Sequence, residues 1–158
     1  MSLRFLIVDG YPPASREEFT ACQSEQAWKL YADMLQAHLP EAGYDVLFPA
    51  DPGSELPAGA ALASYRGILW TGCNLTIYDQ DDERVRRMIE LQRQAYQQGV
   101  PAYGSCWGLQ IAVVAAGGQV AKNPRGREMG LARKIVLTGQ GRAHPFLRDK
   151  PPVFDAFI

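Results

Sequence analysis

Residues 101–110 of the chain read Pro101-Ala102-Tyr103-Gly104-Ser105-Cys106-Trp107-Gly108-Leu109-Gln110. They lead from an extended, buried-looking segment directly into an apolar helix, with one cysteine at the junction. A glycine lies two residues before Cys106 and another two residues after it. Small residues at these positions let a strand turn sharply into a helix, which leaves the central side chain exposed at the apex. The pattern predicts a nucleophile elbow that carries a thiol in place of a serine hydroxyl.

The junction places Cys106 at the N-terminus of the predicted helix, where unpaired amide groups and the helix dipole favour a thiolate. A thiolate there is suited to attack a carbonyl carbon and form a thioester. The N–H groups of Trp107 and of Gly72, at the end of a neighbouring predicted strand, are candidate donors to the resulting oxyanion. The alternative is a structural cysteine, since free cysteines are among the most buried residues.

Strands and helices alternate along the chain as far as residue 118. Predicted strands cover residues 3–8, 44–48, 66–71 and the segment before Cys106, and predicted helices cover residues 25–39, 81–98 and 107–116. Residues 11–22 and 49–60 are expected to be loops. The alternation predicts an α/β fold, a three-layer sandwich whose mostly parallel central sheet has helices on both faces. Asp9, Gly72 and Cys106 then meet at the carboxyl ends of the strands, where such sheets place their sites.

Beyond residue 118 the sequence favours strands. They are expected at residues 119–120, 131–137 and 153–158, with a short turn or helix over residues 143–147. The length of 158 residues suits one domain.

Composition restricts the possible functions. The net charge is −1, from 16 basic and 17 acidic residues, which argues against nucleic-acid binding driven by overall charge. No apolar run approaches the length of a membrane span, and the start of the chain does not resemble a signal peptide. Cys22, Cys73 and Cys106 lack a regular spacing, which favours a reducing compartment. We therefore expect a soluble, cytoplasmic protein that needs no metal and no cofactor.

Three segments, in order, resemble the class I glutamine amidotransferases, in particular the amidotransferase domain of GMP synthases. Residues 104–110 match the family pattern Gly-x-Cys-x-Gly-x-Gln/His. Residues 70–79, Trp-Thr-Gly-Cys-Asn-Leu-Thr-Ile-Tyr-Asp, are similar to the loop that supplies an oxyanion donor in the family. Residues 123–130, Asn-Pro-Arg-Gly-Arg-Glu-Met-Gly, resemble the family segment Gly-x-Glu-x-Gly.

The resemblance implies a single amidotransferase-like, flavodoxin-like domain over residues 1–158. It implies hydrolysis of glutamine to glutamate and ammonia through a thioester on Cys106, with Gly72 and Trp107 as oxyanion donors. Gln110 and Glu128 would bind the substrate glutamine, although each also suits an ordinary surface position. Cys73 is interpreted as a loop thiol. The implied partner is a synthetase subunit that accepts ammonia.

The sequence departs from the family at its carboxyl end. The family activates its cysteine with a histidine that precedes a glutamate by two residues, on a later strand. The chain contains His38 and His144, and neither has a glutamate two residues after it. We therefore expect the C-terminal part of the domain to be missing and the 158-residue chain to be nearly inactive, because a positioned acid–base contributes about 10²- to 10⁴-fold in rate.

Two other functions are compatible with the pattern. The elbow also resembles the cysteine enzymes of the DJ-1/PfpI type, which place a glutamate near the end of the first strand, where this chain has Asp9-Gly10. The third possibility is a catalytically silent module that binds glutamine or a partner synthetase.

Overall fold

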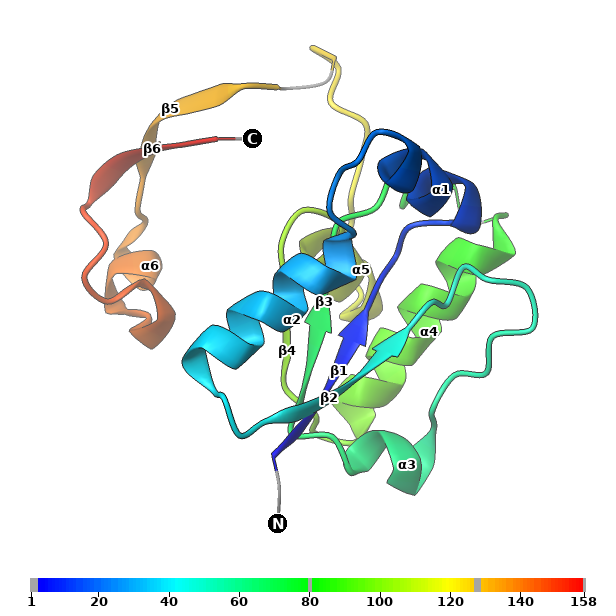
Figure 1. Cartoon of the computed structure of the whole chain (residues 1–158). Helices are drawn as coiled ribbons and strands as arrows, with labels where there is room; N and C mark the ends of the chain where they lie inside the picture. The colour runs from blue at the N-terminus through cyan, green and yellow to red at the C-terminus, as the bar shows by residue number, and fades with distance from the viewer. Residues whose placement is uncertain (1–2, 80, 127–128, 158) are drawn as a thin grey trace. The chain divides into compact units, whose positions relative to one another are not determined.

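The computed structural model describes residues 3–79, 81–126 and 129–157. The chain forms two compact units, Met1–Ala121 and Lys122–Ile158, and each is described by itself. The first contains a four-stranded sheet with its helices, and the second a two-stranded sheet (Figure 1).

The sheet of the first unit is parallel throughout. Its strands are β1 (Arg4–Val8), β2 (Gly43–Leu47), β3 (Gly67–Trp70) and β4 (Ala102–Gly104), in the order β2-β1-β3-β4. The direction in which strands are added reverses between β1 and β3. Ligands of open α/β sheets bind in the crevice at the carboxyl ends of the strands, at such a switch point.

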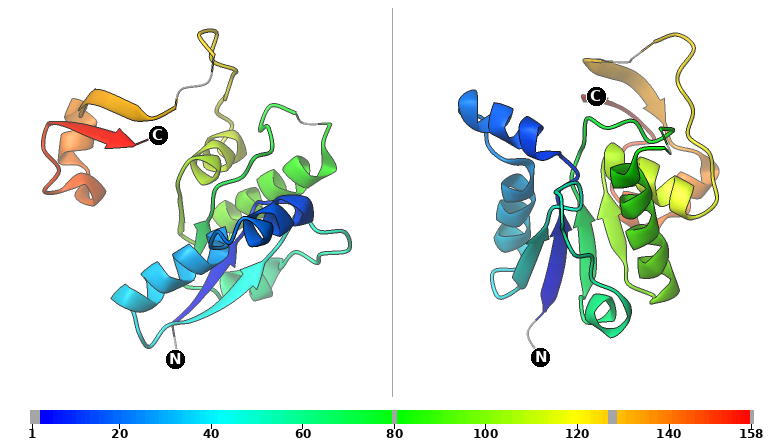
Figure 2. Two further views of the ribbon diagram at one scale, coloured as in Figure 1. Left: turned by 45° about the horizontal axis from the view of Figure 1, so that its top comes forward. Right: turned by 90° about the vertical axis from the view of Figure 1, so that its right-hand side faces the viewer.

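Helices cover both faces of this sheet, which confirms the predicted three-layer α/β fold. Helix α2 (Ala27–His38) lies on one face, and α4 (Glu83–Gln97) and α5 (Trp107–Ala115) lie on the other, as the right-hand view of Figure 2 shows. The short helix α3 (Gly59–Ala63) precedes β3. Asp82 caps α4, accepting a hydrogen bond of 2.9 Å from the Arg84 amide. Such a cap is worth about 1 kcal/mol.

The main hydrophobic core lies between the sheet and the α4–α5 layer. Alternate residues of the strands point into it, as the period of two in a strand requires. Leu6 and Val8 of β1 and Ile68 and Trp70 of β3 belong to this cluster. From the helices it includes the buried side chains Val85, Met88, Ile89, Leu91, Ala95, Trp107 and Ile111. Burial of each large apolar side chain contributes about 1.5–3 kcal/mol.

One predicted loop is wrong: residues 13–21 form helix α1 (Pro13–Ala21). The pair Pro12-Pro13 suggested a helix-breaking loop. Pro13 is the first residue of the helix, where the missing N–H is not needed and the fixed φ is already helical. In Figure 1, α1 lies near the carboxyl end of β1. Arg16 anchors it there, because its guanidinium binds both carboxylate oxygens of Asp51, at 2.7 and 2.9 Å, and the Tyr11 carbonyl oxygen at 2.7 Å.

Burial around the elbow is lower than predicted. Strand β4 lies at the edge of the four-stranded sheet, so Ala102 and Tyr103 are exposed. Helix α5 is apolar apart from Gln110, yet only one side of it faces α4 and the sheet, and Leu109 is exposed. Residues 119–120, predicted as a strand, have no regular structure. Burial of a short strand depends on its neighbours, which its own sequence does not specify.

The second unit is an antiparallel pair of strands, β5 (Leu131–Val136) and β6 (Val153–Phe157), close to the strands predicted there. Between them lie α6 (Gly139–Ala143) and the 3-10 helix η1 (Pro145–Leu147). Thr138 caps α6, accepting a hydrogen bond of 3.0 Å from the Gly141 amide. Within the described part of the chain, no helix reaches the length and apolarity that crossing a bilayer requires.

Candidate functional site

Cys106 occupies the corner between β4 and α5. Its φ of 52° and ψ of −103° are unusual for a residue with a side chain, and it stands at the N-cap of α5. The residue is exposed. Non-glycine residues in sparsely populated backbone regions cost about 1–3 kcal/mol and are concentrated at functional sites. The predicted sharp turn is therefore present, with the thiol at its apex.

The two flanking glycines are required by close backbone packing. A Cβ on Gly104 would lie 2.6 Å from the Cα of Gly108, and a Cβ on Gly108 would lie 2.7 Å from the Cβ of Trp70. Real Cβ atoms do not approach other atoms so closely. The glycines thus let the first turn of α5 pack directly on the ends of β3 and β4, which holds Cys106 above the carboxyl edge of the sheet.

Trp107 and Gly72 lie near this edge. Trp107 begins α5, so its N–H has no acceptor within the helix. Its buried indole packs against Gly10, where a Cβ would lie 3.0 Å from the ring, and its Nε1–H donates to the Met88 sulfur at 3.4 Å. Gly72 follows β3, and a Cβ there would lie 3.1 Å from the Tyr11 hydroxyl. Both predicted oxyanion donors are therefore on segments that lead out of the sheet at its carboxyl edge.

Asp9 organises the neighbouring end of β1. Its buried carboxylate accepts hydrogen bonds from the Tyr11 amide at 3.0 Å, the Trp28 amide at 3.2 Å and the Thr71 hydroxyl at 3.3 Å. Burial raises the pKa of Asp9, and these hydrogen bonds act in the opposite direction. The sequence placed Asp9 at a strand end but did not identify the N-terminus of α2 as its partner. The one available signal was that an acidic residue directly after the buried end of a strand needs donors.

Cys73 differs from Cys106 in its surroundings. Its thiol donates to the Gly10 carbonyl oxygen at 2.9 Å, and its sulfur accepts from the Leu75 amide at 3.2 Å. Burial raises the pKa of Cys73 to about 11. The group is therefore a protonated thiol at neutral pH, in agreement with its interpretation as a loop thiol.

Of the two predicted substrate-binding residues, the structure describes Gln110. This residue lies in the first turns of α5 and is half-buried, and its backbone N–H donates to the Cys106 carbonyl oxygen at 3.1 Å. Glu128 lies outside the described residues.

The histidines lie elsewhere on the chain. His38 is the exposed last residue of α2. His144 belongs to the second unit, where its Nδ1 accepts from the Phe146 amide at 3.2 Å. Among the residues that the structure describes, no three His, Cys, Asp or Glu side chains form a group that could hold a metal ion.

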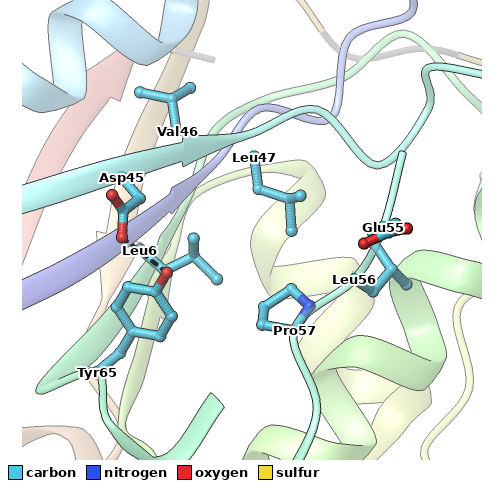
Figure 3. Close-up of a pocket in the computed structure, with 8 residues that line it drawn as sticks. All are labelled: Leu6, Asp45, Val46, Leu47, Glu55, Leu56, Pro57 and Tyr65. Carbon is cyan, nitrogen blue, oxygen red and sulfur yellow. Dashed lines mark hydrogen bonds between the residues drawn. The ribbon is translucent and has the colours of Figure 1, made fainter. Parts of the chain in front are cut away.

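An open hollow of about 300 Å³ lies away from the elbow, beside β2 (Figure 3). Its polar lining consists of Asp45, Glu55 and Tyr65. The Tyr65 hydroxyl donates to Asp45 at 2.7 Å, and Asp45 also pairs with Arg4 at 2.7 Å. The Asp45 carboxylate thus has partners within the protein, and none of the predicted site residues lines this hollow.

Comparison with known proteins identifies relatives along most of the chain. The sequence model of the family "Glutamine amidotransferase class-I" matches residues 51–157. A γ-glutamyl-L-1-hydroxyisopropylamide hydrolase from a Pseudomonas species is 37% identical over 160 residues, covering 98% of this chain and 52% of the relative. A glutamine-hydrolysing GMP synthase from Leifsonia xyli is 32% identical over 101 residues, covering 64% of this chain and 19% of that protein.

Two solved structures share the fold. A glutamine amidotransferase from Thermotoga maritima aligns with a TM-score of 0.70 at 17% identity, over 99% of this chain and 60% of its own. A glutamine amidotransferase from Methylobacillus flagellatus aligns with a TM-score of 0.67 at 22% identity, over 99% and 55%. The chain spans about half the length of the Pseudomonas hydrolase and about a fifth of the GMP synthase. Its sequence and its parallel sheet together lead to one assignment: the chain belongs to the class I glutamine amidotransferase family.

Proposed function

We propose that this protein hydrolyses γ-glutamyl amides, with glutamine as the simplest substrate, through a thioester on Cys106. The observation that carries the proposal is the geometry of the elbow: an exposed thiol at the start of α5, above the carboxyl edge of a parallel sheet. An exposed cysteine at a helix N-terminus is in the kind of environment that activates nucleophilic cysteines.

In the proposed reaction the Cys106 thiolate attacks the γ-carbonyl carbon, and the carbonyl oxygen takes up the negative charge. The N–H groups of Trp107 and Gly72 are the proposed donors to that oxygen, a role that is typically worth about 2.7–4 kcal/mol per donor. The intermediate collapses to a thioester as the amide nitrogen takes a proton and leaves as ammonia or an amine. Water then cleaves the thioester to give glutamate and free Cys106.

The proton transfers set the expected rate. Neither His38 nor His144 is followed by the glutamate with which the family pairs its histidine. We expect the 158-residue chain to react about 10²- to 10⁴-fold more slowly than an enzyme with a positioned acid–base.

The names of the relatives suggest the range of substrates. One is a hydrolase of an N-substituted γ-glutamyl amide, and the other is a glutamine-hydrolysing GMP synthase. We propose that Gln110 and Glu128 bind the glutamyl part common to both substrates. We propose, on the basis of the GMP synthase relative, that the ammonia is transferred to a synthetase partner. We also propose a location in the cytoplasm, on the basis of the cysteine pattern.

We further propose that both units belong to one amidotransferase domain, since the family match runs across them. The family match also favours this function over that of a DJ-1/PfpI-type enzyme. DJ-1/PfpI-type enzymes carry a glutamate near the end of the first strand, where this chain has Asp9. The Asp9 carboxylate already accepts hydrogen bonds from Tyr11, Trp28 and Thr71, which also favours the amidotransferase function.

The test is release of glutamate from glutamine and from γ-glutamyl-1-hydroxyisopropylamide by the 158-residue chain. We expect slow release from at least one of the two amides, abolished in Cys106→Ser and unchanged in Cys22→Ser, since Cys22 is an exposed cysteine elsewhere on the chain. Glutamine binding by calorimetry without any release would instead support a silent binding module. Release that persists in Cys106→Ser would refute the proposal.

A further inference from the structure

Gly10, in the turn after β1, lies between the two segments that carry the proposed oxyanion donors. A Cβ on Gly10 would lie 3.0 Å from the Trp107 ring and 3.1 Å from the Cβ of Cys73. Trp107 begins the helix of the elbow, and Cys73 directly follows Gly72. Because position 10 has no side chain, both segments can pack on the same piece of backbone.

The two residues that flank Gly72 both bind the backbone of Gly10. Thr71 is fully buried, and its hydroxyl oxygen accepts from the Gly10 amide at 3.2 Å. On the other side, the Cys73 thiol donates to the Gly10 carbonyl oxygen at 2.9 Å. The Gly72 peptide is therefore fastened at both ends to one residue of another segment.

Both side chains have further partners that fix their orientation. The Thr71 O–H can donate to the Gly72 carbonyl oxygen at 2.9 Å or to the buried Asp9 carboxylate at 3.3 Å. The Cys73 sulfur accepts from the Leu75 amide at 3.2 Å. Burial raises the pKa of Cys73 to about 11, so the thiol keeps the proton that it donates. Breaking either contact would leave buried polar groups unpaired, which is costly.

The amide of Gly72 is left available by this arrangement. The Thr71 amide donates to the Val8 carbonyl oxygen at 3.0 Å, whereas the Gly72 amide donates to no acceptor among the residues that the structure describes. An oxyanion site requires donors that are fixed in place before the reaction and have no partner in the protein.

We propose that Thr71 and Cys73 are positioning residues: by binding Gly10 on either side of Gly72, they hold the Gly72 amide in place beside the elbow as an oxyanion donor. This inference rests on the proposed function insofar as Gly72 and Trp107 stabilise the oxyanion. It gives the loop thiol of Cys73 a role that involves no nucleophilic chemistry.

The test uses two reactions of Cys106 that differ in charge development. Acylation by γ-glutamyl p-nitroanilide passes through a tetrahedral oxyanion; the carbon–nitrogen bond then breaks, and p-nitroaniline leaves after taking a proton from water. Alkylation by iodoacetamide displaces iodide and forms no oxyanion. Both rates are measured in the full 158-residue chain for Thr71→Val, Thr71→Ser and Cys73→Ala. Peptide mass spectrometry assigns each product to Cys106.

Thr138→Val is the matched control. The Thr138 hydroxyl also accepts from a glycine amide, that of Gly141 at 3.0 Å, but it belongs to the second unit. Relaxation of the ¹⁵N nucleus gives the order parameter of the Gly72 amide in each variant, and urea unfolding checks stability. Cys73→Ala keeps the test open if Thr71→Val does not fold.

We expect Thr71→Val and Cys73→Ala to slow acylation about 5- to 10-fold, as loss of one hydrogen bond implies, through kcat with KM unchanged. Alkylation should stay within twofold of wild type. Thr71→Ser and Thr138→Val should keep both rates. The order parameter of the Gly72 amide should fall from about 0.85 toward 0.6 in Thr71→Val and Cys73→Ala.

Acylation that Thr71→Val or Cys73→Ala leaves at the wild-type rate would overturn the role of that residue. Equal losses in acylation and alkylation would overturn the inference as a whole. If wild-type Cys106 is alkylated but not acylated, the proposed function fails. The order parameters of Gly72 then still decide whether Thr71 and Cys73 hold this peptide, since equal values in wild type and both variants would show that they do not.

Discussion

Replacing Gly104 with alanine tests the packing that creates the elbow. A Cβ on Gly104 would lie 2.6 Å from the Cα and 2.9 Å from the carbonyl carbon of Gly108. An ordinary contact begins at 3.4 Å, so the start of α5 must move by about 0.8 Å. The atoms met are backbone, which cannot rotate away as a side chain can. Overpacking of this kind typically costs about 1–3 kcal/mol.

The assay is urea unfolding followed by tryptophan fluorescence, since Trp70 and Trp107 are buried beside the contact. With a slope of about 1–3 kcal/mol per molar urea, we expect the midpoint of Gly104→Ala to fall by roughly 1 M. Gly43→Ala is the control, because a Cβ there would meet only the Leu3 carbonyl oxygen, at 3.9 Å. Both changes restrict the unfolded chain to the same degree, so their difference isolates the contact.

A displacement of this size should also affect the thiol. Misplacement of reacting groups by about 1 Å can cost about 10²-fold in rate. We therefore expect Cys106 in Gly104→Ala to react at least tenfold more slowly with the γ-chloromethyl ketone analogue of glutamine, whose chloride the thiolate displaces. If Gly104→Ala unfolds at the same urea concentration as Gly43→Ala and reacts at the wild-type rate, the contact between Gly104 and Gly108 does not hold the elbow in place.

Three further predictions follow from individual contacts. Since burial raises the pKa of Cys73 to about 11, iodoacetamide at pH 7 should label Cys106 well before Cys73, and labelling of Cys73 should accelerate only as the pH approaches 11. Peptide mass spectrometry that finds Cys73 labelled first would contradict this prediction. Burial raises the pKa of Asp9 above 3.8 in the folded state, so the folded protein binds this proton more tightly than the unfolded chain does. The stability of the wild type relative to Asp9→Asn should therefore fall as the pH rises from about 3.8 through the raised value. Urea midpoints of the wild type that rise over this range relative to Asp9→Asn would refute this prediction. Arg16→Lys keeps the charge but loses the two-pronged contact that holds α1, so limited proteolysis within residues 12–26 should accelerate severalfold, whereas Arg4→Lys, at an exposed ion pair, should leave it unchanged.

The parallel sheet could be predicted because its evidence is local. The two central strands, β1 and β3, are short apolar runs, and they are followed by the turn signals Asp9-Gly10 and Thr71-Gly72. The elbow could be predicted for the same reason. The spacing of Gly104 and Gly108 around Cys106 reflects contacts between residues that are close in the sequence, so the pattern alone reveals the geometry.

Other features depend on contacts between distant residues. Helix α1 was missed because Pro13 also suits a turn, and the anchoring of α1 by Arg16 requires Asp51, 35 residues away. The exposure of β4 follows from its place at the edge of the sheet, which no residue within the strand specifies.

The proposed hydrolysis requires a covalent bond between the γ-carbonyl carbon of a glutamyl group and the sulfur of Cys106. The most direct measurement is mass spectrometry of the chain after incubation with glutamine and rapid acid quenching. We expect a glutamyl adduct on the peptide that contains Cys106, and no such adduct in Cys106→Ser. Glutamate release without that adduct in a quench series, or an adduct on Cys22 or Cys73, would contradict it.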